Sequence, residues 1–160
     1  MAHSTHTSAL QLSVRAAVAA ALALGIGQLL RLQFPVYAMI SAVVVTDLDP
    51  AETRKLGLPR LAGTVMGATL GALICVLLSP GALEVGLGVL LAMLLSHLVG
   101  LPGAAKMAGF VCGIAIFTYD KAPWSYALHR TIETMIGIAL AVLVSLVPKL
   151  IKLDEPALPH

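Results

Sequence analysis

Charged residues are scarce in this sequence of 160 residues. Asp, Glu, Lys and Arg make up 11% of the chain, against about a quarter in a typical soluble domain. A chain with so little charge cannot cover a water-exposed surface of its size, so a soluble globular protein is excluded. The formal net charge of +2 is also too small to indicate a nucleic-acid-binding protein.

Cysteines and aromatic residues are few as well. The two cysteines, Cys75 and Cys112, both lie inside apolar runs, which argues against a disulfide framework or a metal site. Motifs of enzymes are missing too: the sequence contains no Gly-rich phosphate loop, no metal-ligand cluster and no set of nucleophile, base and orienting group. We therefore expect neither an enzyme nor a bound cofactor.

Apolar residues are abundant and come in long blocks. They make up 59% of the chain, and the mean hydropathy is +0.96. The 14 glycines fit helices that pack closely in lipid, where small residues let backbones approach. A β-barrel would need alternating apolar and polar residues, and none are seen. These features predict a single all-α transmembrane domain over residues 1–160, embedded in the lipid bilayer.

Six apolar segments are expected to form short transmembrane helices. Turn residues such as Ser79-Pro80-Gly81 separate them, and the second and fifth are shorter than the roughly twenty residues that a perpendicular span needs. Residues 46–55 are expected to form a water-facing loop, in which Asp47 and Asp49 are either a cation-binding pair or, as we favour, solvated side chains. The predicted helices are 16–30 (extended back to Leu12), 36–45, 61–78, 83–99, 104–118 and 128–147, after a polar N-terminal tail and before a polar turn at 119–124 and a polar tail at 148–160.

The first apolar run allows a second interpretation. A basic residue, Arg15, followed by about fifteen apolar residues is also typical of a cleaved signal peptide. We favour a spanning helix, because the rest of the chain is itself membrane-embedded.

Lysine and arginine placement predicts the orientation. If both termini are in the cytoplasm, seven of the ten basic residues lie inside and three outside, as the positive-inside rule prefers. The inner residues are Arg15, Arg54, Lys55, Arg60, Lys106, Lys149 and Lys152, and the outer ones are Arg31, Lys121 and Arg130.

An internal repeat is the most informative pattern in the sequence. A spaced pattern of six residues within 58–73 recurs within 128–143, with an offset of 70 and no gap. Arg60 matches Arg130, Thr64 matches Thr134, Gly67 matches Gly137, and three leucines match as well. Coincidence explains the glycine match easily, but arginine is rare in this chain. Each repeat contains three helices, an odd number, so the two halves must insert into the membrane in opposite directions. We therefore expect 3+3 inverted repeats over about 12–80 and 83–148, with a site near the membrane midplane.

Arg60 and Arg130 are the first candidates for a substrate site. A cation within the hydrocarbon layer is costly and usually faces a cavity or a partner, and a guanidinium group matches a carboxylate with two parallel hydrogen bonds. The alternative is that both arginines anchor helix ends by reaching the lipid headgroups.

Three further residues lie on the same helical faces. Thr64 and Thr134 follow their arginines by about one turn and could donate hydroxyls to an anion, or else bond their own helix backbone. Glu133 either couples transport to protons or, as we favour, neutralises Arg130 three residues earlier.

Two stretches together resemble a known family. Residues 35–45, PVYAMISAVVV, are followed by a short polar loop and then by residues 60–71, RLAGTVMGATLG. This pattern resembles the membrane unit of the fusaric acid resistance and aromatic acid exporter family, to which plant aluminium-activated malate channels are distantly related. The resemblance covers roughly residues 12–148 and implies a six-helix half-unit that transports organic or aromatic carboxylates, commonly outward across the bacterial cytoplasmic membrane.

Many members of this family join two such units or append a cytoplasmic domain, whereas this sequence holds one unit. Six short helices hardly enclose a pathway, so a homo-oligomer, a dimer or a trimer, is expected. The sequence thus predicts an efflux carrier or channel-like pathway for organic anions. The alternative is a non-transporting membrane subunit that scaffolds or regulates a partner.

Overall fold

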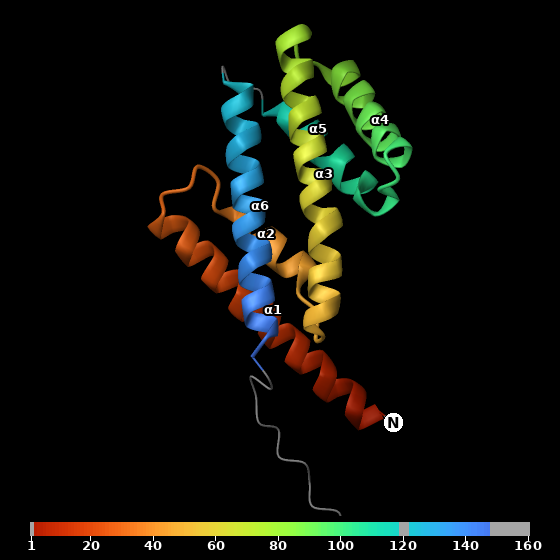
Figure 1. Cartoon of the computed structure of the whole chain (residues 1–160). Coiled ribbons are helices and arrows are strands. Elements are labelled where there is room, and N and C mark those ends of the chain that lie inside the picture. The colour runs from red at the N-terminus through yellow and green to blue at the C-terminus, as the bar shows by residue number, and fades with distance from the viewer. Residues whose placement is uncertain (1, 119–121, 148–160) are drawn as a thin grey trace, which may run out of the picture.

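The computed structural model describes residues 2–118 and 122–147, and these form a bundle of six α-helices (Figure 1). No strand occurs among these residues. The helices are α1 (Ala2–Leu29), α2 (Val36–Val45), α3 (Pro50–Leu77), α4 (Ala82–Leu98), α5 (Ala105–Phe117) and α6 (Pro123–Ser145), with a 3-10 turn, η1 (Pro102–Ala104), before α5.

Three of the helices are long and apolar enough to cross a membrane, namely Thr7–Leu29 within α1, α3 and α6. The 28 residues of α3 measure about 42 Å at 1.5 Å per residue, more than the roughly 30 Å hydrocarbon layer. In contrast, α2 has 10 residues and α5 has 13. The all-helical membrane architecture is therefore confirmed, with two of the short helices where the sequence predicted them.

Helices α3 and α6 form the centre of the bundle. They pack against each other and run in opposite directions, since α3 ascends and α6 descends in Figure 1. The short helix α5 packs on α3, and α2 packs on α6. Helix α4 then covers α5, while α1 crosses α2 and α6 at the other side.

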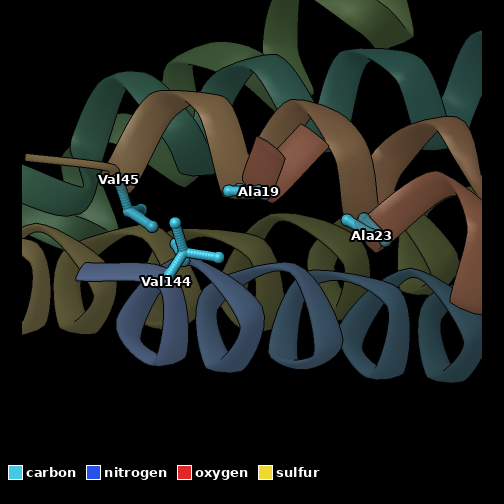
Figure 2. Packing of buried hydrophobic residues seen from close by; sticks show 7 residues of the cluster. Ala19, Ala23, Val45 and Val144 are labelled. Atoms are coloured by element: carbon cyan, nitrogen blue, oxygen red, sulfur yellow. The ribbon is translucent and has the colours of Figure 1, made fainter. Parts of the chain in front are cut away.

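Small side chains allow these helices to approach closely. Ala19 and Ala23 of α1 are fully buried against α2 and α6 (Figure 2). Val45 at the end of α2 and Val144 near the end of α6 belong to the same cluster. In lipid, where expulsion of water contributes little, this packing contact between helices supplies much of the association energy.

Helix α1 begins earlier than predicted. The polar tail before residue 12 was expected to lie outside the first helix, but α1 is helical from Ala2. The sequence His3–Ser8 contains neither Gly nor Pro, so nothing in it stops a helix from extending out of the apolar segment.

Helix α3 also begins earlier, and the predicted loop at 46–55 is wrong in its second half. Asp49 caps the helix, because its Oδ1 accepts from the backbone N–H of Ala51 at 2.8 Å, and Pro50 occupies the first turn. The carboxylate Oδ1 of Asp47 accepts from the N–H of Asp49 at 3.1 Å. The two aspartates therefore shape a turn and a helix start, and Pro59 is accommodated inside the helix.

The last helix starts at Pro123, five residues before the predicted start at 128. Proline suits a first helical turn, since its missing N–H would have no partner there. Residues 119–121 of the predicted turn and the predicted tail 148–160 lie outside the described residues, together with Lys121, Lys149 and Lys152.

Candidate functional site

Arg60 lies on α3 with its side chain 6% exposed. One guanidinium nitrogen, Nη1, contacts the sulfur of Met107 on α5, and Nη2 lies 3.4 Å from the hydroxyl of Ser41 on α2. Its Nε has no hydrogen-bond partner among the described residues. Arg60 thus lies among three helices and has hydrogen-bonding capacity left for an anion.

A pocket of about 310 Å³ opens beside Arg60. This volume lies at the lower end of the range for small-molecule sites. Two cationic residues, Arg60 and Lys106, contribute to its lining, and the remaining walls are apolar. Those walls are formed by Val44, Leu56, Pro59, Gly103 and Met107.

Arg130 on α6 is more deeply buried, at 1% exposure. Its guanidinium carbon lies 3.2 Å from the centre of the Tyr37 ring, so the cation rests on the face of an aromatic ring of α2. Among the described residues, none of its three guanidinium nitrogens has a hydrogen-bond partner. A guanidinium group in this state offers a full set of donors to an anion.

Glu133 is fully buried on the same helix. Its Oε1 accepts from the backbone N–H of Phe34 at 2.7 Å, whereas Oε2 has no partner in the described part of the chain. No ion pair joins Glu133 to Arg130, both of which the structure describes. The carboxylate therefore ties α6 to the turn before α2 rather than closing a salt bridge.

Thr64 and Thr134 lie at the place where α3 and α6 cross. The two hydroxyl oxygens are 3.5 Å apart, and both side chains are fully buried. Thr64 also donates to the backbone carbonyl of Arg60 at 2.9 Å, within its own helix. The predicted site residues Arg60, Thr64, Arg130, Thr134 and Glu133 are therefore gathered on two adjoining helices.

The contacts of the two arginines correspond to each other. Arg60 contacts Met107 and Arg130 contacts Tyr37. Tyr37 and Met107 lie 70 positions apart in the sequence, and the same offset separates Arg60 from Arg130.

The same offset relates the closest helix contacts. A Cβ at Gly67 would overlap the backbone carbonyl of Ala108, and a Cβ at Gly137 would overlap that of Ala38. One turn earlier, a Cβ at Gly63 would lie 2.7 Å from the carbonyl oxygen of residue 104. The positions 70 residues away are Glu133 and Phe34, and these two are joined by a hydrogen bond. The glycines thus let α5 and α2 press against α3 and α6 in corresponding ways.

Sequence reasoning missed the residues that face the arginines. Tyr37 and Met107 appeared only as parts of the two short apolar segments, although the offset of 70 would have paired positions 37 and 107. Phe34 fell in the turn expected before the second segment. Phe34 stacks near Tyr37 and Tyr126, with ring centres 5.9 Å apart in both cases. Their role depends on contacts between helices, which no local pattern reveals.

Comparison with known families agrees with this architecture. The profile of the fusaric acid resistance protein-like family matches residues 20–144, most of the chain. The chain belongs to this family. Searches of curated proteins and of solved structures gave no significant match. This family member is thus a multi-pass membrane protein, and the family indicates a role in membrane transport or export. A relation to malate channels stays a prediction.

Proposed function

We propose that this family member transports organic carboxylate anions, including aromatic ones, across the bacterial cytoplasmic membrane. The observation that carries the proposal is the pair of buried guanidinium groups, Arg60 and Arg130, on adjoining helices. Neither has an acidic partner within ion-pair distance in the described part of the chain. On insertion scales a central arginine costs about 2.5–3.5 kcal/mol, and a transported anion would offset that cost.

The pocket beside Arg60 supports a carboxylate with an apolar body. Its two cationic residues, Arg60 and Lys106, suit the carboxylate, and its apolar walls suit a ring or hydrocarbon portion. Thr64, one turn from Arg60, and Thr134 beside it would contribute hydroxyls when the anion moves between the arginines.

A 3+3 inverted repeat is part of the proposal. Its support is the set of corresponding contacts at an offset of 70, together with the opposite directions of α3 and α6 (Figure 1). In such an arrangement the short helices α2 and α5 would flank a site near the midplane. All six helices would then cross or enter the membrane, with both termini in the cytoplasm, as the lysine and arginine bias favours.

A homo-oligomer completes the proposal. Large apolar side chains such as Leu29, Leu83 and Leu98 are more than three-quarters exposed on the single chain. Such residues face either lipid or a second copy, and one small bundle encloses little space for a pathway.

Anion flux into proteoliposomes tests this function. Benzoate and small dicarboxylates are the probes, and wild type is compared with Arg60→Gln and Arg130→Gln. Each substitution removes a charged donor group, so we expect at least a tenfold loss of saturable flux with an unchanged oligomer on size exclusion. Arg54→Gln, at an exposed position of α3, is the matched control and is expected to retain flux.

The alternative function predicts the opposite pattern. A non-transporting subunit that scaffolds or regulates a partner would give no flux under any imposed pH or voltage gradient. Its Arg130→Gln variant would lose assembly instead. A well-folded oligomer without flux would therefore contradict the transport proposal.

A further inference from the structure

The two corresponding halves differ in the residues that surround each arginine. Beside Arg60, position 107 is Met and position 104 is Ala, and a pocket of about 310 Å³ opens there. Beside Arg130, the positions 70 residues earlier are Tyr37 and Phe34. One arginine thus lines a pocket, whereas the aromatic ring of Tyr37 covers the other.

The aromatic residues form a connected cover. The ring of Tyr37 lies against the guanidinium carbon of Arg130. The ring centre of Phe34 is 5.9 Å from that of Tyr37 and equally far from that of Tyr126. Phe34 and Tyr37 flank the start of α2, while Tyr126 belongs to α6. The cover therefore bridges a short helix and a long one.

A hydrogen bond to Glu133 ties the cover to α6. The backbone N–H of Phe34 donates to Oε1 of Glu133, the residue that replaces Gly63 in the other half. Because residue 34 lies in the turn before α2, the start of this short helix can shift away from α6 once that hydrogen bond breaks.

We propose that Phe34 and Tyr37 form a gate over Arg130, closed in this structure while the pocket at Arg60 is open, and that Glu133 latches it. This inference rests on the proposed transport function for its purpose, since the gate would keep the pathway from opening at both sides at once. Opening requires the Tyr37 ring to leave the guanidinium group, which then becomes free to bind the anion.

The corresponding residues supply the test variants. Tyr37→Met and Phe34→Ala install in the closed half the residues that the open half carries. Tyr37→Phe keeps the ring and is the matched control. A single cysteine, Thr134→Cys, lies about one turn from Arg130 at a fully buried position of α6 and reports access to that region. Cys75→Ala and Cys112→Ala first remove the two native thiols, which are buried.

Labelling of the full-length protein in proteoliposomes with a negatively charged methanethiosulfonate is the measurement. We expect Tyr37→Met and Phe34→Ala to raise the labelling rate of Thr134→Cys at least tenfold, and Tyr37→Phe to leave it unchanged. Lys55→Cys, at an exposed position, must label at the same rate in every background, which shows that the reagent reaches the protein equally in all of them. Unchanged Thr134→Cys labelling in the two opened variants would overturn the gate.

A reciprocal variant keeps the inference testable if the opened variants fail to fold. Met107→Tyr places a ring beside Arg60 and should slow labelling of a cysteine at Val44, which lines the pocket, at least fivefold. Labelling of Val44→Cys at an unaltered rate would argue against a ring as the closing element. These readouts need no flux. Faster labelling in a protein without any anion flux would support the cover and contradict only the transport function.

Discussion

Three buried arginines find different partners in this bundle. Arg15 donates to two backbone carbonyls, Arg60 contacts a thioether and a hydroxyl, and Arg130 rests on an aromatic face. Only the first has partners typical of a structural arginine, because it bonds backbone carbonyls of Leu48, between α2 and α3, and Val147, after α6, which have no partner within a helix. From these partners we assign a structural role to Arg15, and we assign anion binding to Arg60 and Arg130.

Arg15→Gln tests this distinction at the residue scale. The change removes the donors to the carbonyls of Leu48 and Val147, so we expect a loss of stability on the order of 1–3 kcal/mol. Thermal unfolding in detergent measures it, with Arg54→Gln as the exposed control. A melting temperature equal to that of wild type would show that these two bonds contribute nothing to the fold.

Close contact between α3 and α5, and between α6 and α2, depends on glycines at the two helix interfaces. At Gly67 and Gly137 the neighbouring backbone carbonyl leaves no space for a methyl group, and a carbonyl cannot turn aside as a flexible side chain can. In contrast, a methyl group at Gly86 on the exposed face of α4 would meet nothing within 4 Å.

We therefore expect Gly→Ala substitutions between helices and on an exposed helix face to have opposite effects on the stability of the bundle. Gly67→Ala and Gly137→Ala should each destabilise the bundle by about 1–3 kcal/mol, because the paired helices must separate. Gly86→Ala should leave stability unchanged or raise it by about 0.5–1 kcal/mol through helix propensity. The midpoint of thermal unfolding in one detergent compares all three, and equal effects at Gly67 and Gly86 would refute the packing argument.

Opposite insertion of the two halves, which we propose, would be a property of the whole molecule. Helices α3 and α6 begin at opposite ends of the bundle (Figure 1), so their first turns should emerge on opposite sides of a membrane. Lys55 and Ser125 are exposed residues near these two helix starts.

Cysteine labelling from outside intact cells tests this topology. In the variant without native cysteines, an impermeant maleimide should label Ser125→Cys and leave Lys55→Cys unlabelled until the membrane is permeabilised. This pattern would place α3 and α6 in opposite directions with the N-terminus inside. Labelling of both positions from one side would rule out an inverted arrangement.

Composition and pattern alone determined the membrane class, the six helices and the residues to be compared. Charged residues are so few that they cannot cover a water-exposed surface, which indicates a membrane protein. Because arginine is rare in this chain, two arginines at matching positions stand out. The offset of 70 required no structure, because Arg, Thr, Gly and three Leu recur at matching positions without a gap.

Tertiary structure alone decided what faces those residues. Arg15 reaches Val147, 132 positions away, and Glu133 reaches Phe34, 99 positions away. The aromatic cover on Arg130 and the pocket beside Arg60 likewise form between helices that are distant in the chain. Local patterns report the periodicity of one helix, whereas these contacts depend on how closely the glycines let neighbouring helices approach.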